Sequence, residues 1–252
     1  MKRSTSDADP LAKLRPIAAA VTRLSIDEVE QRITTLEPFA TPARRARLDE
    51  NIERRVSGVT LVLDAFHDPH NGAALVRTAD SFGIQTVHAF ERKQALLASR
   101  HVARGSERWV DIVGHRSIES LDAALPQSRV EWIAADASGE LVPEDLRALR
   151  VPFALVIGSE RDGIGADLTS RCGRRVRIPM RGYAESLNVS VTTGILLYEA
   201  MRGRPGDLSV EDKRRLYLRG LIQSLERSHD LLSAAGLALR LSMAIEPIEN
   251  HD

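Results

Sequence analysis

The sequence predicts an α/β protein in which a mostly parallel sheet is covered by helices on both faces. Short apolar runs alternate with helical segments along residues 56–204. The runs VTLVLD (59–64) and FALVI (153–157) are continuously apolar, as expected for parallel strands that are buried on both faces. Hydrophobic residues make up 43% of the 252 residues, which is enough for a packed core.

Two helices are expected before the first strand. Ser25 followed by Glu28 is a capping-box pattern that opens a short helix. Thr41 followed by Pro42 is typical of a cap and the first position of a second helix. This second helix, within residues 41–55, is rich in arginine. It is either a solvated amphipathic helix or an arm that faces RNA.

The remaining elements alternate along the chain. Strands are expected at 59–64, 86–90, 109–113, 130–135, 153–157 and 175–178. Helices are expected at 72–82, 117–125, 143–149, 166–171, 187–202 and from 209 onward, with a further piece at 231–245. This order predicts an N-terminal extension with a basic arm (1–55), an α/β domain (56–204) and a C-terminal helical extension (205–252).

Bulk properties narrow the classes of protein. The 35 basic and 35 acidic residues cancel, so any nucleic-acid binding requires a local patch. The single cysteine, Cys172, excludes an internal disulfide and a cysteine-rich zinc site, and it suits a reducing compartment. We find no apolar run long enough for a membrane span and no signal peptide after Met1. We therefore expect a cytoplasmic protein without membrane contact.

Several familiar site patterns are incomplete. No dinucleotide fingerprint follows the first strand, and Gly158-x-x-x-x-Gly163 lacks the lysine of a P-loop. His67 and His70 have no third ligand at a fixed spacing, so we predict no metal site. Ser186 lacks the G-x-S-x-G context of a hydrolase nucleophile.

Three loops have an unusual composition: 158–163, 179–182 and 186–188. Glycine lets the main chain approach a ligand closely, so such loops form backbone-lined pockets. Upstream, Asn71 is either a helix cap or a site residue. Arg77, within an otherwise small and apolar helix, is either a surface residue or a charge held toward a site.

Together these stretches resemble the three motifs of SPOUT-class RNA 2′-O-ribose methyltransferases. The matching strings are HDPHN (67–71) with RTAD (77–80), GSE (158–160), IPM (178–180) and SLNVSV (186–191). Within the class, the sequence is most similar to the tRNA (guanosine-18) 2′-O-methyltransferase family. The resemblance covers residues 41–204 and extends more loosely past Ser209. It implies a deep trefoil knot over about 153–204, an S-adenosylmethionine cofactor and a homodimer with its active site at the subunit interface.

The resemblance also implies residue roles. The catalytic residues would be Arg77, Asn71, Glu160, Ser186 and Asn188. The cofactor would contact Ala135, Gly158, Ile178, Met180 and Leu187. RNA would contact Arg44, Arg45, Arg54, Arg55, Arg202 and Arg204, and the alternative role of Arg202 and Arg204 is to stabilise the site. Because a guanidinium is normally a permanent cation, Arg77 is better suited to orienting the ribose than to accepting its proton, which leaves an RNA phosphate as the acceptor.

The expected function is therefore S-adenosylmethionine-dependent methylation of the ribose of guanosine 18 in the tRNA D-loop. One alternative is a ribosomal RNA ribose methyltransferase. Such relatives often carry a small RNA-binding domain before the knot, and residues 1–40 are too short for one. A second alternative is an RNA-binding protein without catalysis, which the intact motifs disfavour.

Overall fold

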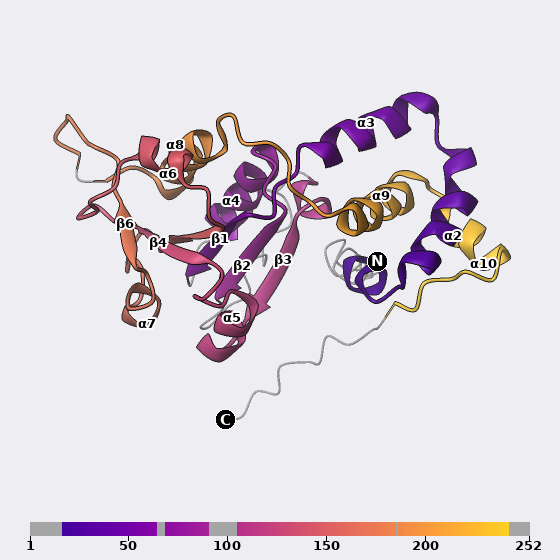
Figure 1. Cartoon of the computed structure of the whole chain (residues 1–252), viewed down its shortest axis with the longest axis horizontal. Helices are drawn as coiled ribbons and strands as arrows, with labels where there is room; N and C mark the ends of the chain where they lie inside the picture. Colours follow the sequence, from indigo (N-terminus) through magenta and orange to yellow (C-terminus); the bar gives the residue numbers. More distant parts are fainter. Residues whose placement is uncertain (1–16, 65–68, 91–104, 185, 242–252) are drawn as a thin grey trace, which may run out of the picture. The chain divides into compact units, whose positions relative to one another are not determined.

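The computed structural model describes residues 17–64, 69–90, 105–184 and 186–241 (Figure 1). The chain forms two compact units. One, the helical unit, combines Met1–Asp49 with Ser209–Asp252, and the other, the sheet unit, is Glu50–Leu208. The functional division at residues 55 and 204 stays a prediction. None of the described helices is long and apolar enough to cross a membrane.

The helical unit joins segments from both ends of the sequence. Its elements are α2 (Ile26–Leu36), the 3-10 turn η1 (Glu37–Phe39), the first part of α3 (Pro42–Glu53), α9 (Val210–Ser224) and α10 (Ser228–Ala234). The predicted capping box is confirmed, since Ser25 Oγ accepts from the Glu28 N–H and the Glu28 carboxylate accepts from the Ser25 N–H. Helix α2 packs against α9 and α10.

Polar contacts reinforce this packing between α9 and the N-terminal segment. The Arg214 guanidinium donates to both carboxylate oxygens of Glu30, at 2.6 and 2.5 Å. The Tyr217 hydroxyl donates to the Glu37 carboxylate at 2.8 Å. The piece predicted at 231–245 is instead α10, which begins at Ser228. It ends before Gly236, whose φ of 71° is the left-handed conformation that terminates helices.

The described residues of the sheet unit form six strands, all parallel. They are β1 (Val59–Asp64), β2 (Thr86–Phe90), β3 (Asp111–His115), β4 (Glu131–Ala135), β5 (Phe153–Ile157) and β6 (Arg174–Val176). Their order in the sheet is β3-β2-β1-β5-β4-β6. Every pairing between neighbours is parallel, which confirms the predicted sheet.

Helices surround this sheet. They are α4 (Pro69–Ser81), the 3-10 turn η2 (Ser106–Arg108), α5 (Ile118–Ala124), α6 (Pro143–Ala148), α7 (Ala166–Thr169) and α8 (Val189–Met201). The trefoil knot predicted for residues 153–204 concerns the path of the chain through its own loops. Strand order alone does not define that path, so the knot stays a prediction.

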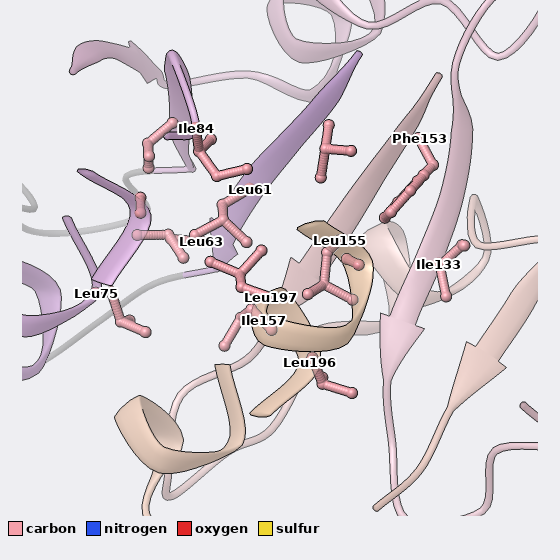
Figure 2. Close-up of a cluster of buried hydrophobic side chains, with 14 of the residues drawn as sticks. Leu61, Leu63, Leu75, Ile84, Ile133, Phe153, Leu155, Ile157, Leu196 and Leu197 are labelled. Atoms are coloured by element: carbon pink, nitrogen blue, oxygen red, sulfur yellow. The ribbon is translucent and has the colours of Figure 1, made fainter. Parts of the chain in front are cut away.

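Each face of the sheet has its own hydrophobic core. On one face, Leu61 and Leu63 of β1 pack with Leu75 of α4 and Leu197 of α8 (Figure 2). On the other face, alternate residues of the same strands pack against α5 and α7. This second cluster contains Val62, Trp132, Val156, Leu121 and Leu168. Burial of both faces explains why the strands are continuously apolar in sequence.

Several boundaries differ from the sequence prediction: β6 covers Arg174–Val176 where 175–178 was predicted, and the largest shifts are at the starts of α4 and β3. Helix α4 begins at Pro69, so Asn71 lies in its first turn and is not its cap. Proline is well suited to that first position because its missing N–H is not needed there. Strand β3 begins at Asp111, since 106–108 forms a 3-10 turn and the Asp111 N–H then donates to the Gln85 carbonyl at 2.8 Å.

The two ends of the sheet unit are joined by Asp207. Its carboxylate accepts from the Ser57 N–H at 2.5 Å, the Ser57 hydroxyl at 2.9 Å and the Gly58 N–H at 3.0 Å. The neighbouring Gly206 lies so close to the Glu53 carbonyl that a Cβ would overlap it. This contact holds the start of β1 against the chain that leaves α8.

Candidate active site

A cavity of about 610 Å³ lies at the carboxyl ends of β4, β5 and β6. Its walls come from Ala135 and Asp136 after β4, the 157–164 segment after β5 and the 176–187 segment after β6. Three residues of α8 complete it: Val189, Thr192 and Leu196. In parallel α/β sheets, ligands bind outside the carboxyl ends of the strands, which makes this cavity the candidate site.

The loop after β5 is closed on itself. The Ser159 N–H donates to the Gly163 carbonyl at 3.1 Å, and the Gly163 N–H donates back to the Ser159 carbonyl at 3.0 Å. Gly163 has a φ of 66°, which favours glycine. A Cβ on Gly158 would overlap the Gly163 backbone, so only glycine fits this closed loop without movement. The two glycines predicted from the sequence are thus required by the local geometry.

Asp64, the last residue of β1, anchors the segment that follows this loop. The buried carboxylate of Asp64 accepts from the Gly165 N–H at 2.7 Å. Gly165 is the N-terminal cap of α7 and follows the closed loop directly. Because a charged acceptor makes a strong hydrogen bond when it is buried, this contact fixes where the loop leaves the sheet.

Asn188, at the end of the 186–188 loop, connects the 158–163 loop to α8. Its side-chain amide donates to the Glu160 carboxylate at 2.7 Å. Its side-chain oxygen accepts from the Ser190 N–H at 2.9 Å, which caps α8. The two hydrogen bonds use opposite ends of one amide, so they fix its orientation as well as its position.

The structure brings together the residues predicted to hold the cofactor. All of them line the cavity: Ala135, Gly158, Ile178, Met180 and Leu187. Of the predicted catalytic residues, Glu160 and Ser186 also line it, and Asn188 contacts Glu160. Arg77 is exposed on α4, and Asn71 is half-buried. Neither is among the described residues that line this cavity.

Sequence reasoning missed the contribution of α8. Val189, Thr192 and Leu196 line the cavity and recur at spacings of three and four, so they share one face of the helix. That spacing was a signal available in the sequence. Asp136 was also missed. The Ser138 hydroxyl and N–H donate to its carboxylate at 2.6 and 2.7 Å and lower its pKa, so Asp136 places a carboxylate at the cavity wall.

The arginines predicted to contact RNA lie in different environments. Arg44 is exposed, and Arg45 is half-buried. Arg54 is exposed and pairs with Glu50 at 2.6 Å, one turn earlier in α3. Arg202 is exposed and lies 3.5 Å from Glu199. The Arg54–Glu50 pair is exposed on both sides and contributes little to stability, whereas the Glu199 side chain that faces Arg202 is mostly buried.

Two of the predicted RNA contacts serve the fold instead. The prediction for Arg55 does not fit its position, because its guanidinium is buried, pairs with Asp80 and donates to the Ile84 carbonyl at 3.1 Å. Arg204 is half-buried and donates to the Leu149 carbonyl at 2.8 Å. It also lies over the Phe153 ring, 5.6 Å from its centroid, and burial lowers its pKa. Arg204 therefore matches the site-stabilising role that the resemblance allowed.

Comparisons with known proteins agree with this architecture. Residues 58–198, more than half of the chain, match the SpoU rRNA Methylase family. The tRNA (guanosine(18)-2′-O)-methyltransferase of Escherichia coli K12 is 34% identical over 165 residues, which are 65% of this chain and 71% of that enzyme. The 23S rRNA (guanosine-2′-O-)-methyltransferase of Haemophilus influenzae is also 34% identical, over 71% of this chain and 74% of that enzyme.

Solved structures show the same fold. The tRNA-modifying enzyme TrmH/SpoU of A. aeolicus has a TM-score of 0.63 and 29% identity, covering 73% of this chain and 97% of that one. An AdoMet-bound rRNA methyltransferase of Sinorhizobium meliloti has a TM-score of 0.53 and 27% identity, covering 64% of this chain and 61% of that one. The family predicted from the motifs is confirmed: the chain belongs to the SpoU family and is an RNA 2′-O-ribose methyltransferase.

Proposed function

We propose that the substrate of this enzyme is tRNA and that the modified position is guanosine 18 of the D-loop. Sequence identity does not decide between a tRNA and a ribosomal RNA substrate, since the tRNA enzyme and the ribosomal RNA enzyme are both 34% identical to this chain. Coverage of these two relatives does not separate them either, at 71% of the tRNA enzyme and 74% of the ribosomal RNA enzyme. Coverage of the two solved structures favours tRNA. The chain spans 97% of the A. aeolicus tRNA-modifying enzyme but 61% of the S. meliloti ribosomal RNA enzyme.

S-adenosylmethionine is the methyl donor of the reaction. A cavity of about 610 Å³ is within the usual range for a cofactor of this size. Its walls combine apolar side chains such as Ile157 and Leu196 with the exposed main chain of the closed 158–163 loop. That combination suits a ligand with an adenine ring and polar ends. We assign its binding to Ala135, Gly158, Ile178, Met180 and Leu187.

The reaction moves a methyl group from sulfur to oxygen. The carbon–sulfur bond breaks as the ribose 2′-oxygen forms its bond to the methyl carbon, and the hydroxyl loses its proton. A neutral hydroxyl is a weak nucleophile, so the protein must hold it in line and assist departure of the proton. We assign this task to the groups at the cavity. The observation that supports the assignment is the hydrogen bond by which Asn188 holds the Glu160 carboxylate at the cavity wall.

Arg77 and Asn71 complete the catalytic set in this proposal. Arg77 carries a permanent positive charge, which suits it to orienting the ribose and a phosphate and to stabilising negative charge on the oxygen. The proton then passes to an RNA phosphate. Ser186 lines the cavity, and we assign it a contact with the same ribose.

A second copy of the chain would supply Arg77 and Asn71, since in one chain these residues do not line the described cavity. The outer face of α8 supports this arrangement. It exposes Val191, Ile195 and Tyr198 at helical spacing, while the inner face of the same helix lines the cavity. An apolar stripe so close to the site suits burial against a symmetric partner. We therefore infer a homodimer.

The test uses two matched tRNA transcripts, one with guanosine and one with 2′-deoxyguanosine at position 18. With tritiated S-adenosylmethionine, the first transcript should be labelled and the second should not. Equal labelling of both would reject guanosine 18 as the target. Labelling of 23S rRNA fragments alone would reject tRNA as the substrate and leave the family assignment unchanged. Absence of S-adenosylmethionine binding by calorimetry would favour a non-catalytic RNA-binding protein.

A further inference from the structure

The helical unit carries a second cavity, with a volume of about 410 Å³. One wall is the turn between α2 and α3, with Phe39 and Arg44. The opposite wall is the junction of α9 and α10, with Leu225, Arg227 and Leu231. All of these residues belong to the helical unit, so this cavity is separate from the methyl-transfer site.

The Phe39 ring is exposed although the backbone that carries it is fixed. The side chain of Phe39 is 56% exposed. In the same turn, the Ala40 N–H donates to the Glu37 carbonyl at 3.0 Å, and the Glu37 carboxylate accepts from the Tyr217 hydroxyl. Thr41 then caps α3 through the Arg44 N–H at 3.3 Å. The backbone that carries the ring is therefore fixed, and the ring lines the cavity.

The opposite wall is equally well defined. The buried Ser228 donates its hydroxyl to the Ile222 carbonyl at 2.7 Å, and its N–H donates to the Leu225 carbonyl at 3.1 Å. These bonds fix the turn between α9 and α10. Leu225 and Leu231, both half-buried, give this wall an apolar surface that faces the cavity with Phe39.

The rim of the cavity is mainly basic. The Arg44 guanidinium is exposed and has no ion-pair partner among the residues that the structure describes. Arg227 lies 3.7 Å from Asp230, but both side chains are more than 70% exposed, so this pair is weak. Glu226 is the acidic member of the lining. Two arginines and one aromatic ring thus line the same cavity.

An unstacked nucleotide matches this combination. Its base offers a flat face to an aromatic ring, and its phosphates offer negative charge to arginines. A cavity of about 410 Å³ is also within the size range of small-ligand sites. We propose that this cavity binds an unpaired nucleotide of the substrate RNA, with its base stacked on Phe39 and its phosphates near Arg44 and Arg227. This proposal rests on the RNA substrate of the enzyme.

The test compares three variants of one position. Phe39→Ala removes the ring, Phe39→Leu keeps apolar volume without a flat face, and Phe39→Trp keeps a flat face. Val210→Ala is the matched control, since Val210 is 77% exposed in α9 of the same unit and does not line the cavity. Binding of a fluorescent single-stranded RNA 12-mer is measured by anisotropy, because this readout does not require methyl transfer.

We expect Phe39→Ala and Phe39→Leu to weaken RNA binding about 5- to 150-fold, as loss of one stacked base does, and Phe39→Trp to bind as tightly as the wild type. Cofactor affinity should not change in any variant. Arg44→Gln should also lower the slope of log affinity against log salt by about 0.7. In turnover assays with the RNA that the wild type methylates, Phe39→Leu should raise KM and leave kcat unchanged.

Equal RNA affinity of Phe39→Leu and Val210→Ala would overturn the proposal. The proposal would also be overturned if Phe39→Ala changed the oligomeric state without changing RNA affinity, because the Phe39 ring would then contact another protein chain. If the proposed tRNA specificity is wrong, the assays give a different result. The wild type would then methylate another RNA or none, while the effect of Phe39 on binding of the 12-mer would remain measurable.

Discussion

The amide of Asn188 donates to the carboxylate of Glu160 at 2.7 Å, and this contact joins two loops that are 28 residues apart in sequence. The same amide caps α8 through the Ser190 N–H. One side chain therefore couples the loop after β5 to the helix whose inner face lines the cavity.

Asn188→Asp separates the two roles of this residue. Aspartate still caps α8, but it cannot donate to Glu160, and the two carboxylates repel each other. We expect kcat/KM for methyl transfer to fall at least about 10-fold, which corresponds to about 1.4 kcal/mol. The melting temperature should stay near that of the wild type. Wild-type turnover in this variant would show that the contact does not matter for catalysis.

Gly158→Ala should open the cofactor loop. A Cβ at this position overlaps the Gly163 backbone, so the closed loop must move. We expect the affinity for S-adenosylmethionine to weaken at least about 10-fold by calorimetry, since the cavity wall is lost. Gly173→Ala is the matched control, because a Cβ there meets nothing within 4 Å. Equal cofactor affinity of the two variants would contradict the assigned wall.

Arg77→Ala should abolish methylation and leave cofactor affinity unchanged, because Arg77 does not line the described cavity. If the site is shared between subunits, mixing Arg77→Ala with Gly158→Ala should restore activity, measured at an S-adenosylmethionine concentration that fills the wild-type site and leaves the weakened Gly158→Ala site almost empty. Random exchange makes half of the dimers mixed, each with one intact site, so about a quarter of wild-type activity is expected. No recovery after verified subunit exchange would place Arg77 and the cofactor in the same subunit.

The buried pair His88 and His115 predicts a loss of stability in mild acid. The His88 Nδ1 lies 2.9 Å from the His115 Nε2, and burial, together with the nearby His115, lowers the pKa of His88 to about 4. The unfolded chain, with a histidine pKa near 6.5, binds the proton more readily. Stability from this group is therefore complete above about pH 6.5 and decreases toward pH 4, by about 3 kcal/mol in total.

Urea unfolding at pH 7.5, 5.5 and 4.5 measures this loss. His88→Phe removes the titrating group and keeps an aromatic ring at the same buried position. Its free energy of unfolding should change less across this pH range than that of the wild type. The same pH slope in both proteins would assign the acid sensitivity to other groups.

Much of the sheet unit was predictable from local sequence. Strands such as 59–64 and 153–157 are continuously apolar because both faces are buried, and Gly83 ends α4 with a φ of 77°. The start of α4 was missed because Asn71 was interpreted as a possible cap, when the helix already begins at Pro69. The motifs identified the cavity residues, but only the fold shows that the loops close around one cavity.

Sequence patterns did not predict the contacts between residues that are far apart along the chain. Arg55 looked like part of a basic arm, yet Asp80, 25 residues later, pairs with it inside the fold. The helical unit depends on Arg214 contacting Glu30 across 184 residues. No local periodicity encodes such pairs. The same holds for the nucleotide cavity, since its two walls come from opposite ends of the chain.

The most direct test of the proposed function is to map the methylated nucleotide. Wild-type protein is incubated with S-adenosylmethionine and an unmodified tRNA transcript, which is then digested with nucleases and analysed by mass spectrometry. We predict one added methyl group, on the ribose of guanosine 18. A methyl group on a base, or on a ribose at any other position, would contradict this assignment.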